Sequence, residues 1–288
     1  MELSLQPLQL LPATITGVLY ALGVRRLDRT PRAVPAWRQA CFYSGLVLIV
    51  VTLTCLGSLA DDLFSVHMVE HLLIGDIGTL LLVLGLTGPL LAPVLRIKFF
   101  DRLRVLAHPV VAFVLWALDL YIWHTPFFHD AAVNHEVVHA VQHTGFIVFG
   151  ANMWMALLGP LPKPAWFGNL AKLGYIIAVR FTGAILGNIL VFGGHDFFPV
   201  YAAGEAKHHI SAAADQTAAG AIMMVEGSIL TLCLFAWLFM RAAQESEERQ
   251  QLLELAEARG VQLSEQRAAR AVTAGRTAEL RERIQRSG

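Results

Sequence analysis

The sequence predicts an all-α, polytopic membrane protein, a bundle of seven transmembrane helices. Of its 288 residues, 56% are hydrophobic and only 15% are charged, and the mean hydropathy is +0.55. This composition argues against a soluble protein. Seven apolar stretches are each close to the ~20 residues that cross a bilayer; they are approximately residues 8–24, 40–60, 64–95, 105–123, 132–158, 171–194 and 215–240. The third is long enough to tilt or to break near Gly85, Gly88 and Pro89.

The basic residues between these stretches predict the orientation of the chain. Lys and Arg in short loops stay on the cytoplasmic side. Three alternate loops hold most of them: Arg25, Arg26, Arg29, Arg32 and Arg38; Arg96, Lys98, Arg102 and Arg104; and Lys163 and Lys172. The other loops, 61–66, 124–131 and 195–214, contain Lys207 alone. We therefore expect the N-terminus outside and the C-terminus in the cytosol, with the first stretch retained as a span because it lacks a basic n-region.

The composition changes abruptly at residue 241. Residues 1–240 form the predicted seven-helix transmembrane domain, whereas residues 241–288 are rich in Glu, Arg, Gln and Ala. These residue types favour helix, and Gly260 interrupts the pattern, so we expect a cytosolic helical tail. The formal net charge is +0, which gives no indication of a nucleic-acid partner. The three cysteines stand singly in apolar stretches and form no CxxC pair, so we interpret them as packing residues.

One arginine lies inside the predicted membrane region. Arg180 falls about halfway along the sixth stretch, where an unpaired charge costs at least ~2.5–3.5 kcal/mol on insertion scales. Asp76 and Glu226 lie at comparable depth in the third and seventh stretches. We expect Arg180 to form an ion pair with one of them, and the three residues to make an intramembrane charge network. A proton or ion path along the same residues stays open as an alternative.

The histidines form the most informative pattern of the sequence. Five of the eleven lie between residues 124 and 143, and three of these recur every fourth residue, at His135, His139 and His143. On a helix this spacing puts all three on one face. His67 and His71 repeat the spacing in the third stretch. The predicted orientation places every histidine except His108 at or near the outer ends of the spans.

This pattern predicts a metal or haem site. Neutral imidazole is a common ligand of zinc, copper, iron and nickel, and paired histidines on facing helices can supply three or four nitrogens. His124 and His195 stand at neighbouring span ends, and Met68 offers a thioether that suits Cu(I). We expect the third and fifth stretches to be neighbours whose histidine faces meet, with about three strong ligands and one open, water-exposed position.

The sequence resembles the CtaG-type cytochrome c oxidase assembly factors of bacterial membranes. The motifs that carry the resemblance are LFSVHMVEHLLI (63–74), PLLAP (89–93), WHTPFFHDA (123–131), HEVVHAVQHTGF (135–146), FPVYAA (198–203) and DQTAAGAIMM (215–224). They run in family order within residues 10–240. The sequence departs from the family at Val225, where a tryptophan is usual.

The resemblance implies an accessory, non-enzymatic role in maturing a haem–copper oxidase. Such a protein would handle copper at the outer face of the bacterial inner membrane, with oxidase subunits and the lipid bilayer as its partners. The family histidines, carried onto this sequence, give the candidate copper ligands His67, His71, His124, His135, His139 and His143.

Two other functions are compatible with the same histidines. A membrane-embedded zinc hydrolase would need a general base, for which Glu70, Glu136, Asp61 and Asp62 are candidates. A b-type haem protein would use histidines on two helices as axial ligands of the iron.

Overall fold

The computed structural model describes residues 7–97, 105–106 and 108–287, and every regular element in these ranges is a helix. The chain divides into two compact units, Met1–Ile229 and Leu230–Gly288. Helix α13, Ala212–Ala258, belongs to both units, so the division falls inside the last apolar stretch, N-terminal to the predicted boundary at 241.

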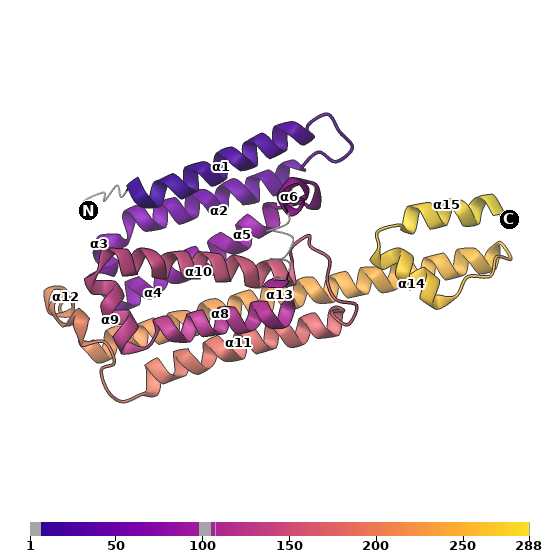
Figure 1. Ribbon diagram of the computed structural model, residues 1–288. Helices are drawn as coiled ribbons and strands as arrows, with labels where there is room; N and C mark the ends of the chain where they lie inside the picture. The colour runs from indigo at the N-terminus through magenta and orange to yellow at the C-terminus, as the bar shows by residue number, and fades with distance from the viewer. Residues whose placement is uncertain (1–6, 98–104, 107, 288) are drawn as a thin grey trace. The chain divides into compact units, whose positions relative to one another are not determined.

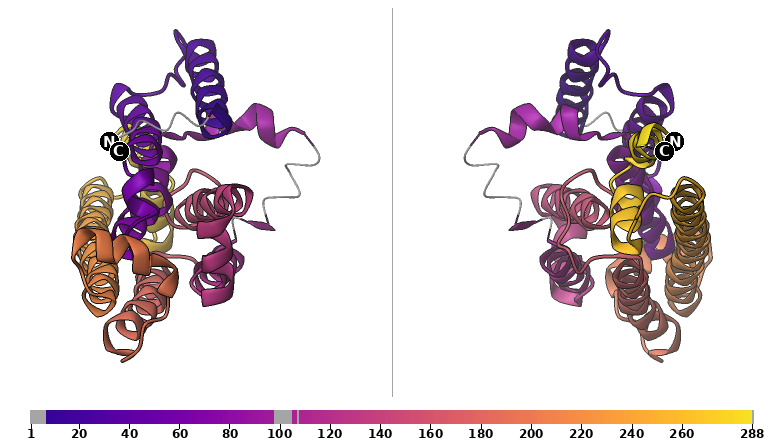
Figure 2. Two further views of the ribbon diagram at one scale, coloured as in Figure 1. Left: turned by 90° about the vertical axis from the view of Figure 1, so that its left-hand side faces the viewer. Right: turned by 90° about the vertical axis from the view of Figure 1, so that its right-hand side faces the viewer.

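The first unit contains the apolar helices (Figure 1). Besides the start of α13, its described elements are α1 Pro7–Leu27, α2 Ala36–Cys55, α3 Gly57–Ala60, α4 Phe64–Leu72, the π-helical turn η1 Leu73–Gly78, α5 Thr79–Gly85, α6 Gly88–Leu95, α8 Pro109–Trp123, α9 Pro126–Asn134, α10 Glu136–Leu157, α11 Asn169–Phe192, the 3₁₀ turn η3 Pro199–Tyr201 and α12 Ala202–His208. Within this unit, η1 and α5 pack between α2 and α10 (Figures 1 and 2).

Four helices or continuous helical runs are long and apolar enough to cross a membrane, namely Ala36–Cys55, Phe64–Gly85, Asn169–Phe192 and Ala212–Ala258. The bent pair α8–α9, with an angle of 72°, brings the number to five if it counts as one span. Helix α10 has 22 residues but carries histidines and Gln142, which lower its hydropathy. The count of seven spans and the orientation of the termini therefore stay predictions. Lys98, Arg102 and Arg104, on which the orientation partly rests, lie outside the described residues.

The third apolar stretch breaks where the sequence predicts. Helix α5 ends at Gly85, Leu86 and Thr87 are extended, and α6 begins at Gly88 with a proline in its first turn. Thr87 is the N-cap residue of α6, a position that usually takes extended backbone, and Pro89 fits the first turn of a new helix but not the interior of a continuous one. The continuous run available for one span is therefore Phe64–Gly85, shorter than the predicted 64–95.

The second unit is helical, as predicted for the tail. Helix α13 ends at Ala258, just before Gly260 with its positive φ of 64°. Helices α14, Glu265–Thr273, and α15, Thr277–Ser287, follow. The unit has an apolar core of its own, made by Leu252, Ala256, Ala271, Val272, Leu280 and Ile284.

Candidate metal centre

The third and fifth apolar stretches meet through two glycines. A Cβ atom on Gly150 of α10 would overlap the carbonyl oxygen of Gly75 in η1, and a Cβ on Gly75 would lie 3.3 Å from the Cβ of Phe146. Only residues without side chains allow two helix backbones to approach so closely. The contact brings the histidine-bearing segments α4 and α10 together. Helix α4 ends where the π-helical turn η1 begins, and such turns are frequent at functional sites.

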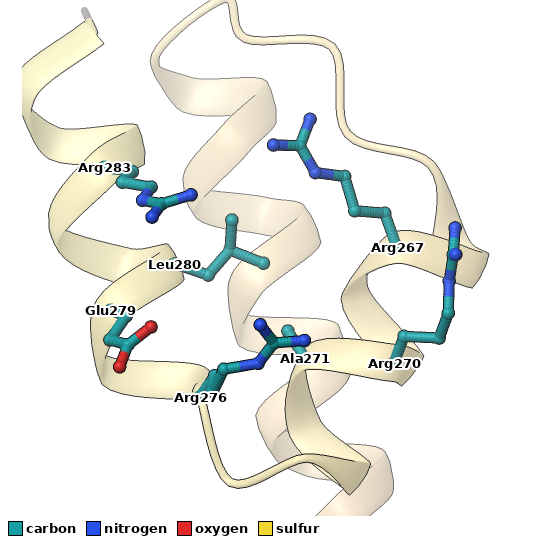
Figure 3. A pocket seen from close by; sticks show the side chains of 7 residues that line it. All are labelled: Arg267, Arg270, Ala271, Arg276, Glu279, Leu280 and Arg283. Atoms are coloured by element: carbon teal, nitrogen blue, oxygen red, sulfur yellow. The ribbon is translucent and has the colours of Figure 1, made fainter.

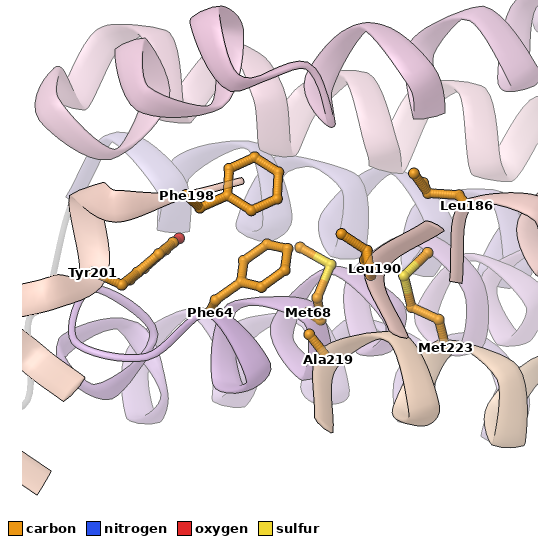
Figure 4. Packing of buried hydrophobic residues seen from close by; sticks show 8 residues of the cluster. All are labelled: Phe64, Met68, Leu186, Leu190, Phe198, Tyr201, Ala219 and Met223. Carbon is orange, nitrogen blue, oxygen red and sulfur yellow. The ribbon is translucent and has the colours of Figure 1, made fainter. Parts of the chain in front are cut away.

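A carboxylate from a distant part of the chain fixes the start of α4. Asp215 of α13 accepts hydrogen bonds from the backbone N–H groups of Phe64, at 2.7 Å, and Ser65, at 3.1 Å. These are helix N-terminal donors that have no partner inside their own helix. On its apolar side, α4 packs Phe64 and Met68 against Phe198 and Tyr201 (Figure 4). Helix α4 is therefore held both at its end and along one face.

The structure brings four of the predicted histidines into one cluster. His67, His71 and His139 each contribute one ring nitrogen, and these three atoms lie within 4.8 Å of one another. The rings of His67 and His139 stack, with centroids 5.4 Å apart and planes at 12°. His143 extends the cluster: its ring centroid is 4.2 Å from that of His139 and 5.4 Å from that of His71.

A carboxylate joins this histidine cluster. Ligand atoms of Glu70, His139 and His143 form a second group within 4.8 Å, and the Glu70 Oε2 atom lies 3.8 Å from the His143 Nε2 atom. His139 belongs to both groups. The cluster therefore offers two overlapping sets of three ligand atoms, one purely nitrogenous and one with a carboxylate.

The polar atoms of the cluster are buried and unpaired. His67 is 0% exposed, Glu70 1%, and His71 and His143 5% each. Both ring nitrogens of His67, His71 and His143, with Nε2 of His139, have no hydrogen-bond partner in the described part of the chain. Buried polar atoms are normally paired, so this set has unused capacity to bind a ligand.

A metal ion fits these donors. Histidine nitrogens bind zinc or copper at about 2.0–2.1 Å, so two nitrogens on one ion lie at most about 4.2 Å apart. Small side-chain rotations would bring atoms now within 4.8 Å to that separation. The sequence predicts one coordination position that is open to water. Because His67, His71 and His143 are buried, this position can lie only on the side of His139, which is partly exposed.

His124 lies beside Met68 rather than in the three-nitrogen group. Its Nδ1 atom is 2.7 Å from the Leu120 carbonyl oxygen, which can only accept, so Nδ1 carries the proton. In the neutral ring, Nε2 then presents its lone pair to the Met68 sulfur, 3.3 Å away. Both residues, together with His71 and Met223, line a cavity of about 40 Å³. This is a nitrogen and thioether pair of the kind that Cu(I) prefers.

Two further predicted ligands, His135 and His195, also lie outside the cluster. His135 has extended backbone, with φ −136° and ψ 111°, and α10 begins after it at Glu136. The helical phase of His139 and His143 therefore does not extend to His135, whose side chain is exposed. His195 is also exposed, and its Nδ1 atom contacts the Gly193 carbonyl oxygen at 2.9 Å.

Two residues of the site escaped the sequence prediction of ligands. Glu70 lies three residues after His67, a spacing that puts both on one helix face, so the signal was present. His129 of α9 is 0% exposed, with its ring centroid 4.9 Å from that of His67 and its Nε2 atom 2.8 Å from the Tyr201 hydroxyl. No spacing in the sequence relates His129 to His67, because their contact is tertiary.

The predicted ion pair of Arg180 is not formed among the described residues. The guanidinium of Arg180 instead donates to the Met224 carbonyl oxygen, at 2.7 Å, and to the Ser228 hydroxyl, at 2.8 Å. A Cβ on Gly227 would lie 2.6 Å from the guanidinium, so the glycine makes room for it. Asp76 and Glu226 are not within ion-pair distance of Arg180. Five N–H donors let arginine satisfy itself with neutral oxygens, which the prediction did not consider.

Two adjacent carboxylates near the cluster have different surroundings. Partial burial raises the pKa of the Asp61 carboxyl, and the neighbouring His139 imidazole lowers it. Asp62 instead accepts hydrogen bonds from Lys207, at 2.6 Å, and from His208, at 3.0 Å, and these bonds lower its pKa. Of these two carboxylates, Asp61 is therefore the one whose pKa the His139 imidazole influences.

These features define a helical protein with several membrane-spanning candidates and a buried cluster of histidines and one carboxylate, whose side chains could hold a metal ion. The sequence profile of a family described as cytochrome c oxidase caa3 assembly factor, Caa3_CtaG, matches residues 18–245. The chain belongs to this family, in agreement with the resemblance of its histidine motifs.

Curated relatives come from mycobacteria. An uncharacterised protein of Mycobacterium leprae is 27% identical over 199 residues, which cover 62% of this chain and 30% of the relative. Uncharacterised proteins of Mycobacterium bovis and Mycobacterium tuberculosis are each 29% identical over 195 residues, covering 62% of this chain and 29% of the relative. The chain thus spans less than a third of the length of these relatives. No solved structure matches the chain.

Proposed function

We propose that this protein binds copper at its histidine cluster and delivers the ion to a subunit of a haem–copper oxidase. One observation carries the proposal: buried nitrogens of His67, His71 and His139, from two helices, lie within 4.8 Å of one another and lack hydrogen-bond partners among the described residues. Membership of an oxidase assembly family supports the same role. The basic loops predict that the site faces the outer side of the bacterial inner membrane.

The donor set favours copper among the metals that histidine binds. Copper(II) forms the most stable complexes of the divalent first-row metals with nitrogen ligands, and Cu(I) prefers imidazole and thioether. The adjoining pair of His124 and Met68 supplies one donor of each kind, 3.3 Å apart. A nitrogen at about 2.0 Å and a sulfur at about 2.3 Å from one ion fit that separation. His71 lines the same cavity, which connects this pair to the cluster.

Delivery requires that the ion be released as well as bound. His139 is shared by the group with His67 and His71 and by the group with Glu70 and His143. An ion could therefore pass between the two groups while one ligand stays attached. His139 is also the partly exposed member, so we assign capture and release to this side.

The two alternative functions find less support. A zinc hydrolase could use Glu70 as its general base, since this carboxylate lies beside His139 and His143. Glu70 is only 1% exposed, however, and the cavity beside His71 has about 40 Å³. Small-molecule pockets usually measure about 300–1,000 Å³, so neither a lipid head group nor a haem has room there.

A genetic experiment tests the delivery role. In a strain that lacks its own copy, the wild-type protein should yield an oxidase with its full copper content. His71→Ala and His139→Ala should yield oxidase without copper. The matched control His108→Ala should behave as wild type, because His108 stands at the start of α8 and belongs to neither group of ligand atoms. Excess copper in the medium should partly restore the oxidase. Fully copper-loaded oxidase in every variant would contradict the proposal.

A further inference from the structure

The second unit contains a pocket lined mainly by arginines. It lies between α14 and α15, which are joined by a turn at Gly275 with φ 65°, and its volume is about 290 Å³. We call it the arginine pocket; its lining is Arg267, Arg270, Ala271, Arg276, Glu279, Leu280 and Arg283. Figure 3 shows the guanidinium groups of Arg267, Arg276 and Arg283 turned toward the space between the two helices.

An apolar core lies beneath these arginines. Ala271 and Leu280 belong to the apolar core and form the floor of the pocket, so the hydrophobic effect already holds α14 against α15. Four guanidinium groups around one space repel one another, and Glu279 is the one carboxylate in the lining. Glutamine or serine at the four positions would serve a solvated helix face equally well.

Two other arginines of the unit pair with carboxylates. Arg241 contacts Glu245 at 2.9 Å and Arg286 contacts Glu282 at 3.4 Å, each one helical turn apart. The guanidinium groups of Arg267 and Arg276 have no such partner within the described residues. Two guanidinium groups of the pocket lining are therefore available to pair with an anion from solution.

We propose that the arginine pocket is a binding site for a phosphate-bearing anion. Guanidinium is planar, keeps its charge, and donates two parallel hydrogen bonds to phosphate oxygens, a geometry that lysine does not offer. Arginines on both walls can contact one phosphate group from two sides, and the volume of about 290 Å³ accepts a diphosphate or a phosphate with a small apolar portion over Leu280. The source of the phosphate is a soluble compound or a lipid head group.

The experiment uses the full-length protein in phosphatidylcholine nanodiscs. In one arm, pyrophosphate is titrated by calorimetry against chloride of matched ionic strength. In the other arm, nanodiscs that contain phosphatidic acid are compared with phosphatidylcholine alone by hydrogen exchange of residues 264–284. We expect binding in one arm, and Arg267→Gln with Arg276→Gln should weaken it by about tenfold or more, because two charge-assisted contacts are lost. Binding of pyrophosphate would assign a soluble ligand. Slower hydrogen exchange with phosphatidic acid, without pyrophosphate binding, would assign a lipid head group.

Two further variants keep the proposal falsifiable. The variant Arg286→Gln, whose change lies outside the lining, should bind the anion as tightly as wild type. This result would show that binding depends on the pocket and not on the overall positive charge of the unit. Glu279→Gln removes the single carboxylate of the lining and should tighten binding by several-fold, a gain that misfolding cannot produce. No binding in either arm, or equal binding by the double variant and Arg286→Gln, would overturn the proposal.

Discussion

Replacing Gly150 by alanine tests whether the contact between α10 and η1 sets the spacing of the histidines. A Cβ at this position would overlap the Gly75 carbonyl oxygen and would lie 3.1 Å from the Gly75 carbonyl carbon. Carbon atoms pack at about 3.5–4.0 Å, and the overlap with the carbonyl oxygen is the tighter of the two contacts, so the two helices must separate by roughly 1 Å or more. Overpacking of this size typically costs ~1–3 kcal/mol of unfolding free energy.

The same displacement should weaken the metal site. His143 lies two turns before Gly150 on α10, whereas His67 and His71 lie on the opposite side of the contact, on α4. Metal–ligand distances must hold within about 0.2 Å. We expect Gly150→Ala to lower the affinity for Cu(I) by about tenfold or more, a loss typical of changes that misplace ligands without removing them.

The matched control is Gly174→Ala on α11, where an added Cβ meets no heavy atom within 4 Å. Alanine is favoured over glycine inside a helix by roughly 0.5–1 kcal/mol, so this variant should be as stable as wild type or more stable. Thermal unfolding in detergent gives the stability, and competition with a chromophoric Cu(I) chelator gives the affinity. Wild-type stability and affinity in Gly150→Ala would refute the reasoning.

Three further predictions address residues around the site. Asp61→Asn should slow copper capture in stopped-flow measurements, because the charge of Asp61 interacts with the His139 imidazole. Asp62→Asn should not, because Asp62 is engaged by Lys207. Equal rates would exclude Asp61 from the path of the ion. Burial lowers the pKa of Lys163 from 10.5 to about 8, so the folded protein holds this proton more weakly than the unfolded chain. Stability should therefore rise from pH 8 to pH 10.5, and Lys163→Met should lack that rise in thermal melts; parallel curves would contradict it. Double-mutant cycles should give stronger coupling of Arg180 to Ser228 than to Glu226, since the guanidinium donates to the Ser228 hydroxyl at 2.8 Å; the reverse order would restore the predicted ion pair.

Local signals in the sequence anticipated much of the helical framework. The break after Gly85 follows from a Gly-Pro pair, and the end of α13 before Gly260 follows from the conformational freedom of glycine. The i, i+4 spacing of His67 and His71, and of His139 and His143, identified side chains that the structure brings together. These features depend on neighbours along the chain, which a sequence displays directly.

The remaining features depend on tertiary contacts. The approach of Gly75 to Gly150 and the bond from His129 to Tyr201 join residues far apart in the chain, and no spacing encodes them. His135 was misplaced because the helix starts one residue after it. For Arg180 the prediction considered only carboxylates as partners, whereas its guanidinium donates to two neutral oxygens.

The most direct test of the account is the metal content and coordination of the purified protein. Protein loaded with Cu(I) should retain copper on elemental analysis, and X-ray absorption should show nitrogen ligands at about 2.0 Å. His71→Ala and His139→Ala should lose this copper, and His108→Ala should retain it, because the former two supply ligand atoms of one group. Equal copper retention by all three variants, or none in the wild type, would contradict the assignment of the histidine cluster as the copper site.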